Sequence, residues 1–438
     1  MSRTPAAPPL ADDLVDFLNA SPSPFHAVAE CARRLSAAGF VELRDADDWQ
    51  IERPFYLTRG GSTIAAVVPG TRSPSESGLR IIAAHTDSPN LRLKPRAEFE
   101  RHGYRQLGVE VYGGVLLSTW MDRELSAAGR LALRSAQGEM LYPLLDLERP
   151  LAIVPNLAIH LNREVNSAGL VLNRQEHLPP VYALSSFGPQ SWTKLLQETL
   201  TAGQGIEGEI LAWDLGLYEA RPAQRIGVQG EFIASGRIDN LASCHAAIQA
   251  LSASGPRPES TQIVVCYDHE ECGSRSAKGA ASTFLATLIE RVLAMHEAAD
   301  RSRLHRVIAR SLLVSLDMAH GVHPNYAERH DAQHRPQLGA GPVIKVNVNQ
   351  SYASDAETQS VFAECCREAG VSPQSFVVRS DLPCGSTVGP ILAAALGIRS
   401  VDVGNPMLAM HSCRELCAAA DVEPMVGALK AFLKSRLS

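Results

Sequence analysis

The sequence lacks long apolar runs and blocks of basic residues, and each absence excludes a class of protein. No apolar stretch approaches the roughly 18 uncharged residues that a membrane-spanning helix needs. The start, Met1–Asp13, has prolines and two acids where a signal peptide has its apolar region. Because Lys and Arg are scattered, the chain lacks the charged surface expected of a nucleic-acid binder. We therefore expect a soluble cytoplasmic protein with no membrane or nucleic-acid partner.

Paired cysteine motifs are also absent. The nine cysteines run from Cys31 to Cys417 without a CxxC pair, so we expect reduced thiols and no disulfide framework. Cys413 and Cys417 lie beside His411 and could suggest a structural zinc. A spacing of four is also one helical turn, and a closed zinc site needs four ligands, so we favour buried apolar thiols.

The chain is rich in apolar residues. Of its 438 residues, 45% are hydrophobic and 20% are charged, with a net charge of −6. At roughly 150 residues per domain, this length predicts two or three domains with a large buried core. A mainly disordered chain is therefore excluded.

Short β-branched runs alternate with longer helical patterns. The predicted strands are Thr63–Val68, Leu79–Ala84, Gln262–Tyr267, Ser311–Leu316, Val343–Val348 and Ile398–Val403. The predicted helices are Leu10–Asn19, Phe25–Ala38, Asn240–Ser252, Ser282–Ala298, Glu357–Glu368, Ser386–Leu396 and Val422–Leu437. This alternation predicts the α/β class, a layered sheet with helices on both faces.

Between about Leu91 and Phe232 the pattern changes. Gly and Pro punctuate short alternating pieces, which are Val109–Tyr112, Gly129–Leu133 and Gly208–Trp213. We interpret this stretch as a mainly β module inserted into the α/β domain. The predicted segments are residues 1–91 and 234–438 for the α/β domain and residues 92–233 for the insertion.

Metal-ligand side chains follow three of the predicted strands. His85 and Asp87 end one strand, the acids up to Glu270 and Glu271 follow a second, and Asp317 ends a third. Because the carboxyl ends of the strands in an open α/β sheet converge on the ligand crevice, these groups can meet in space. Two more candidates, Asp239 and His411, begin helical segments.

Each of these residues alone has an ordinary interpretation. Asp239 opens a predicted helix and can be an N-cap, His85 can be a hydrogen-bonded core histidine, and paired glutamates are usually solvated. Taken together, two histidines and several carboxylates after uncharged strands would be very costly to bury without cations. Mixed His and carboxylate ligands suit zinc or a similar first-row divalent ion, and one carboxylate can bridge two metals.

Two local spacings suggest supporting roles. His85 and Asp87 are two apart on a strand, so both point to one side, and Asp87 can orient the imidazole. The adjacent Glu270 and Glu271 must diverge. One can then bind metal while the other takes a proton from metal-bound water.

Seven stretches in this order resemble the M18 metallo-aminopeptidases, the aspartyl aminopeptidase family, over nearly the whole chain. They are Ser21–His26, Ala84–Pro89, Val154–Arg163, Gly236–Leu241, Asp268–Ser274, Gly341–Lys345 and Gly404–His411. The resemblance implies a metallopeptidase α/β domain interrupted by a dimerisation domain, and a tetrahedral homo-dodecamer.

The resemblance also implies residue roles. Asp239 would bridge two metals, completed by Glu271 and His411 at one site and by His85 and Asp317 at the other. Glu270 would be the general base. His160 would reach a neighbouring subunit's active site, although its ordinary interpretation is a strand histidine. Lys345 would pair with an acidic substrate side chain, although most lysines are simply exposed.

The predicted reaction is zinc-dependent removal of N-terminal residues, with acidic residues preferred. Cobalt or manganese in place of zinc, and a preference for apolar N-termini, remain open. So does a related two-metal amide hydrolase, such as a deacetylase or dipeptidase. From another class, a shell-forming binding or scaffold protein that has lost catalysis would lack a ligand or the base, and none is missing.

Overall fold

The computed structural model describes residues 9–49, 53–187, 191–255 and 257–436. The chain forms two compact units, which we call unit 1 and unit 2. Unit 1 comprises Met1–Asp87, Ala223–Met410 and Glu415–Ser438, and unit 2 comprises Ser88–Pro222 and His411–Arg414. The predicted insertion, residues 92–233, has different bounds, and its role as a dimerisation domain stays a prediction.

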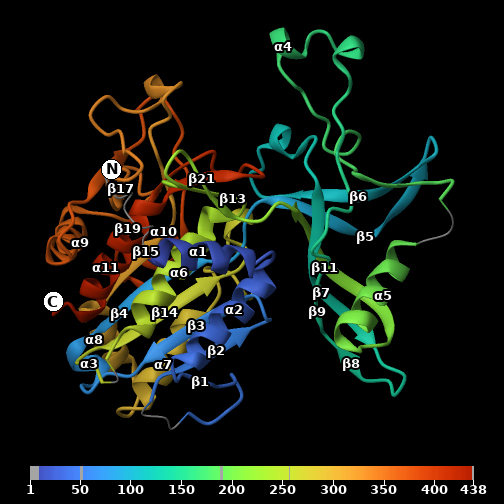
Figure 1. The fold of residues 1–438 in the computed structure, drawn as a ribbon. Helices are drawn as coiled ribbons and strands as arrows, with labels where there is room; N and C mark the ends of the chain where they lie inside the picture. The colour runs from blue at the N-terminus through green and yellow to red at the C-terminus, as the bar shows by residue number, and fades with distance from the viewer. Residues whose placement is uncertain (1–8, 50–52, 188–190, 256, 437–438) are drawn as a thin grey trace, which may run out of the picture. The chain divides into compact units, whose positions relative to one another are not determined.

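Unit 1 is built on a nine-stranded sheet in the order β1-β2-β3-β14-β4-β15-β19-β17-β18 (Figure 1). The strands are β1 Val41–Glu42, β2 Phe55–Arg59, β3 Thr63–Val68, β14 Thr261–Tyr267, β4 Leu79–His85, β15 Leu312–Leu316, β19 Arg399–Gly404, β17 Val343–Val346 and β18 Gln374–Val377. The central strands β14, β4, β15 and β19 are parallel. Their carboxyl ends therefore lie at one edge of the sheet.

Helices cover both faces of this sheet. On one face lie α1 Pro9–Asn19, α2 Pro24–Ala37, α6 Ile238–Ser252, α9 Ala356–Glu368 and α11 Val422–Lys434. On the other lie α7 Phe284–Ala294, α8 Arg301–Arg310 and α10 Val388–Leu396, and a short α3 spans Pro74–Ser77. Alternate strand residues serve the two cores, with Ile82 in one and Ile81 in the other. The predicted three-layer α/β architecture is confirmed.

A second sheet of unit 1 has five short strands. They are β12 Gln224–Ile226, β13 Phe232–Ser235, β21 Glu415–Ala418, β20 Pro406–Leu408 and β16 Ala319–His320. The 3-10 turns of unit 1 are η3 Glu270–Cys272, η4 Ala327–Arg329 and η5 Ala419–Asp421. Because β12 pairs with β13 here, residues from Ala223 onward belong to unit 1, ahead of the predicted boundary at 234.

Unit 2 is mainly antiparallel β structure. Its strands are β10 Val181–Leu184, β6 Tyr104–Tyr112, β5 Asn90–Arg101, β11 Glu209–Glu219, β7 Leu125–Arg134, β8 Met140–Leu141 and β9 Leu144–Asp146. Its helical pieces are η1 Leu117–Trp120, η2 Ile159–Leu161, α4 Val165–Ala168 and α5 Trp192–Gln204. Helix α5 was missed, although Ser191 caps it and Trp192, Leu196 and Leu200 form its buried stripe.

The predicted strand Thr63–Val68 has the bounds of β3, and the ends of the other predicted elements are shifted. The strand predicted to reach Val348 ends at Val346, because Asn347 Oδ1 accepts the amides of Asn349 and Ser351 in a turn. Helix α7 is shorter than predicted, and the basic helix α8 was not predicted. The predicted end at Leu437 lies outside the described residues. Within the described part of the chain, no helix is both long and apolar enough to cross a membrane.

Candidate metal centre

His85, the last residue of β4, lies at the middle of the candidate site and is 1% exposed. Its Nδ1 lies 3.0 Å from the backbone oxygen of Asp87. A carbonyl oxygen can only accept, so in the neutral ring Nδ1 carries the proton. The Nε2 lone pair is then directed at carboxylates, with Asp239 Oδ1 and Asp317 Oδ1 each 3.7 Å away.

Asp239 enters the site at the start of α6. Its backbone is not helical, with ψ 107°, and its peptide bond to Asn240 is cis. Arg237, the residue before this helix, makes no side-chain cap bond. Its amide donates to Glu415 Oε2 at 3.1 Å, and Asn240 Nδ2 donates to the Leu316 oxygen at 2.9 Å. These bonds fix Asp239 against β21 and β15.

Asp317 follows β15, and its carboxylate lies between two cationic or metal-binding groups. One oxygen is near His85, and the other is 3.5 Å from Lys345 Nζ. Lys345 is 2% exposed, donates to the Met318 oxygen at 3.2 Å and lies 5.1 Å from the Tyr352 ring centre. β19 approaches closely here, since a Cβ at Gly404 would lie 1.8 Å from the Asp317 oxygen.

Glu270 and Glu271 lie in the turn η3 after β14. The Asp87 carboxylate accepts both of their amides, at 3.1 Å each, one on each oxygen. Asp87 is fully buried and also lies 3.5 Å from His85 Nδ1. It therefore holds both the imidazole and the turn that carries the two glutamates.

Two groups of ligand atoms within unit 1 can hold a metal ion. Atoms of His85, Asp239 and Asp317 lie within 4.8 Å of one another, and so do atoms of His85, Glu270 and Glu271. The donors are one imidazole and four carboxylates, and the three residues of the first group are buried. This donor set fits zinc or a related divalent ion, since uncompensated carboxylates at such distances repel strongly.

The pKa values show the same crowding in the metal-free chain. Burial and nearby carboxylates, against the effect of His85, raise the pKa of Glu270 to about 7. Burial, helped by Asp239, raises the pKa of Glu271 well above its usual value. Burial also acts to raise the pKa of Asp317, but Lys345 and His85 outweigh it and the net shift is downward. Burial acts to lower the pKa of His85, but Asp317 and Asp87 raise it well above its usual value. A bound cation would stabilise the ionised carboxylates and the neutral imidazole, and would therefore lower the raised pKa values.

Two predicted site residues belong to unit 2. His411 has φ 68°, and its Nδ1 lies 3.0 Å from the Gly114 oxygen, which leaves Nε2 as the lone-pair nitrogen of the neutral ring. His160 is exposed in η2, in a 3-10 turn rather than a strand. The placement of both residues at the metal centre stays a prediction.

Sequence reasoning missed three residues that hold the ligands in place. Glu415 is a buried carboxylate that accepts the Asp239 amide, and nothing in its local sequence indicated this. Asn240 was available as a signal, because a polar residue inside an apolar helix usually has a buried partner. Gly404 lies at the end of a predicted strand, and a glycine there can indicate that another backbone segment approaches closely.

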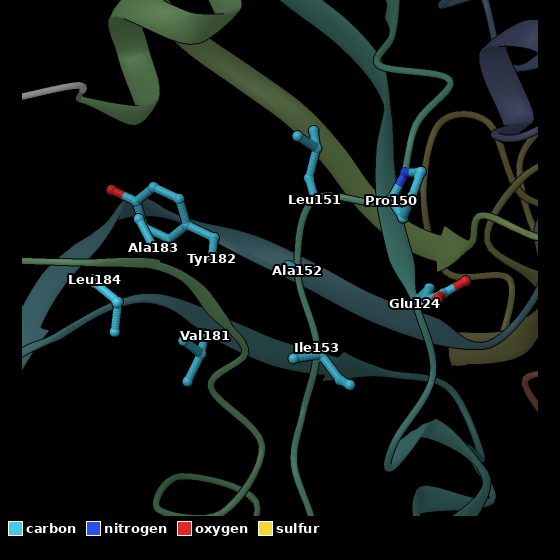
Figure 2. Close-up of a pocket in the computed structure, with 9 residues that line it drawn as sticks. All are labelled: Glu124, Pro150, Leu151, Ala152, Ile153, Val181, Tyr182, Ala183 and Leu184. Carbon is cyan, nitrogen blue, oxygen red and sulfur yellow. The ribbon is translucent and has the colours of Figure 1, made fainter. Parts of the chain in front are cut away.

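A separate hollow of about 400 Å³ lies in unit 2 (Figure 2). Its lining is formed by Glu124, Pro150, Leu151, Ala152, Ile153, Val181, Tyr182, Ala183 and Leu184. Two backbone hydrogen bonds join Ile153 to Val181 along this lining. The lining contains one acid and no histidine or lysine, so it lacks the paired groups that hydrolysis requires.

A sheet between two helical layers, with buried His and carboxylate side chains at the strand ends, is the arrangement expected of a metal-dependent hydrolase. A family model described as "Aminopeptidase I zinc metalloprotease (M18)" matches residues 17–433. The chain therefore belongs to the M18 family of zinc metallo-aminopeptidases.

Relatives and solved structures agree with this assignment. A Pseudomonas fluorescens (strain Pf0-1) protein named "Probable M18 family aminopeptidase 2" is 48% identical over 431 residues, 98% of each chain. A chain in the cryo-EM structure of the Ape4 and Nbr1 complex has a TM-score of 0.93 and 38% identity, covering 97% of this chain and 85% of that one. The S. cerevisiae mApe1 dodecamer has a TM-score of 0.85 and 26% identity, covering 98% and 97%.

Proposed function

We propose that this enzyme removes one N-terminal residue at a time from peptides and uses two divalent cations, normally zinc. Asp239 would contribute to both cations, His85 and Asp317 would complete one site, and Glu271 and His411 would complete the other. The observation that carries the proposal is the group of buried carboxylates around His85, in which like charges lie close together. A catalytic cation is the simplest source of compensation for such a group.

The protein's own residues perform the proton transfers. When bound, the cations polarise the scissile carbonyl and make water more acidic. Glu270 takes the proton of the attacking water and returns it to the leaving amine. Its pKa of about 7 belongs to the metal-free chain, where burial and nearby carboxylates raise it, and bound cations would lower it. Asp87 keeps Glu270 in place through the backbone of the turn.

Acidic N-terminal residues are the preferred substrates in this proposal. Lys345 supplies the positive charge, since its ammonium is buried 3.5 Å from the candidate ligand Asp317. A carboxylate that enters this region meets a cation with little competing water. An aminopeptidase that favours apolar residues is the alternative, as is a related two-metal hydrolase that cleaves another amide.

We also propose a homo-oligomer with tetrahedral dodecameric symmetry, in the cytoplasm. The mApe1 structure named above is a dodecamer. In this chain, unit 2 carries large apolar side chains at its surface, among them Leu157, Leu161, Val171 and Phe187. Such surfaces mark association sites. Twelve subunits of 47.2 kDa give a particle of about 570 kDa, with His160 directed to a neighbour's site.

Peptide hydrolysis with and without a chelator tests the proposed function. We expect free amino acid from short peptides with a free amino terminus and none from N-acetylated peptides, because the substrate's amino group is a ligand in this proposal. Exhaustive chelation should abolish activity, and zinc should restore it at two ions per subunit. Cleavage of acetylated peptides, or full activity without metal, would contradict the proposal.

A further inference from the structure

The turn that carries Glu270 and Glu271 is held by a second set of contacts, away from the ligand atoms. It begins at Asp268, which is 2% exposed. Asp268 Oδ2 accepts the Ser62 hydroxyl at 2.6 Å and lies 3.7 Å from Lys278 Nζ. The Asp268 amide donates to Thr63 Oγ1 at 3.0 Å. The start of the turn is therefore fixed to β3.

His269 follows with a left-handed backbone, φ 66° and ψ 24°. Few residues other than glycine adopt this conformation, although His and Asn do so more often than most. His269 therefore turns the chain between Asp268, which follows the end of β14, and Glu270, which begins η3. The side chain of His269 extends across the turn, and its Nδ1 lies 2.7 Å from Ser276 Oγ.

The direction of this hydrogen bond follows from its neighbours. Ser276 Oγ already accepts the amides of Lys278 at 3.2 Å and Gly279 at 3.1 Å. A hydroxyl oxygen has two acceptor lone pairs, so its own proton is donated to His269 Nδ1. The proton of the neutral ring is then on Nε2, which lies 3.5 Å from Asp268 Oδ2.

We infer that His269 and Ser276 are positioning residues that close the turn carrying Glu270 and Glu271. Asp87 holds the amides of Glu270 and Glu271, and the His269–Ser276 bond ties the residue before them to the segment after them. Neither residue is required to touch the substrate. The inference rests on the proposed function of Glu270 as general base and Glu271 as ligand.

The first experiment removes the bond from each end. Ser276→Ala and His269→Ala should each lower kcat roughly 10- to 100-fold at saturating zinc, because small displacements of a catalytic group have effects of this order. KM should stay within about twofold, since substrate contacts are not removed. The double variant should lose little more than either single one, because both remove the same bond. The zinc dissociation constant, measured by chelator competition, should rise in parallel.

Rescue variants separate positioning from general support of the fold. Ser276→Thr keeps the hydroxyl donor. His269→Asn keeps a residue that tolerates the left-handed backbone, and its amide oxygen can accept in place of Nδ1. Both should retain most of kcat. Ser360→Ala, which removes an exposed hydroxyl bonded to the Glu357 oxygen in α9, should change nothing.

Several outcomes would overturn the inference. The first is an unchanged kcat in Ser276→Ala. The second is an equal fall in kcat in Ser276→Ala and Ser276→Thr. The third is a change in KM with no change in kcat. The melting temperature of the metal-free chain identifies a variant that fails to fold, in which case the variant at the other end of the bond decides. Glu270→Gln in the same assay tests the proposed function separately. If that variant keeps full activity, Glu270 is not the base, whatever Ser276→Ala does.

Discussion

The carboxylate of Glu219 in unit 2 and the carboxylates around His85 in unit 1 have opposite surroundings. In unit 2, the buried carboxylate Glu219 is paired with two arginines, Arg123 at 3.1 Å and Arg414 at 2.8 Å. In unit 1, the carboxylates of Asp239, Asp317, Glu270 and Glu271 converge on the imidazole of His85, and Lys345 lies 3.5 Å from Asp317. Pairing offsets the cost of removing a buried charge from water, whereas like charges that converge need a further cation to offset it.

The two units also differ in how many large apolar side chains they expose. The central strands β4, β14 and β15 of unit 1 are buried on both faces, as parallel strands between two helical layers must be. Unit 2 leaves large apolar side chains exposed, with Leu161 at 74% and Val171 at 85%. The difference indicates that chemistry is concentrated in unit 1 and association in unit 2.

The largest expected effect concerns the converging carboxylates. Glu270→Gln should lower kcat by roughly 10²–10⁴, the usual contribution of a general base, while zinc content and melting temperature stay unchanged. Glu271→Gln should instead weaken zinc binding. Glu290→Gln on the exposed side of α7 is the matched control. Steady-state kinetics with metal analysis checks this, and the opposite behaviour of the two variants would exchange their roles.

The next effect concerns the single lysine in this group. Lys345→Met keeps the side-chain length and removes the charge. It should lower kcat/KM for aspartyl and glutamyl substrates, with little loss for leucyl substrates. The expected loss of transition-state stabilisation is about 2–5 kcal/mol, the cost of breaking a buried charge pair. Lys434→Met at the exposed end of α11 should leave both unchanged. Equal losses on both substrate types would mean that Lys345 acts only through Asp317.

A buried carboxylate of unit 1 outside the ligand group gives a pH effect. Burial, opposed by hydrogen bonds from the Gly339 and Gly341 amides, raises the pKa of Asp421 to about 6. A raised pKa means that the folded state favours the protonated form. The free energy of unfolding should therefore fall as the pH rises from about 4 to 6, by about 3 kcal/mol in total.

Asp421→Asn checks this effect, because an amide does not titrate. Thermal unfolding of the metal-free chain is measured across this pH range. As the pH rises, the variant should lose less free energy of unfolding than the parent chain. The variant also loses an acceptor for one glycine amide, which shifts its stability by the same amount at every pH. Identical slopes would mean that Asp421 titrates near its usual value in the folded chain.

The contrast between the units also explains what sequence could predict. The central strands β3, β4, β14 and β15 are continuous apolar runs, so their existence and the ligands that follow them could be read directly. Because strand ends meet at one edge of the sheet, these groups were expected to lie close together, whereas their assignment as ligands rested on the family resemblance and stays a prediction. Asp239 could not be separated from an N-cap on sequence alone, since its non-helical backbone depends on Glu415 and Asn240.

Elements set by tertiary contacts were harder to predict. The pairing of Lys345 with Asp317 joins different strands, and no local pattern specifies it. The tie between His269 and Ser276 depends on a left-handed residue that the sequence does not mark. Helix α5 was missed because the sequence around it in unit 2 alternates as strands do. Helix α8 was missed because most of its residues are basic or polar and Val307 is its buried residue.

The smallest expected effect, at Leu161 in unit 2, is measured beside the same substitution at Leu313 in unit 1. Leu313 is fully buried in β15, and Leu161 is 74% exposed in η2. Leu313→Ala should lower the free energy of unfolding by about 2–5 kcal/mol, because it leaves a cavity in a packed core. Leu161→Ala should change it by no more than about 0.5 kcal/mol in the isolated subunit. Light scattering of the Leu161 variant should nevertheless show fewer particles near 570 kDa if this side chain lies in a subunit contact. An unchanged assembly would place the contact at other apolar residues of unit 2, and a large loss of stability in the subunit would show that Leu161 packs within its own chain.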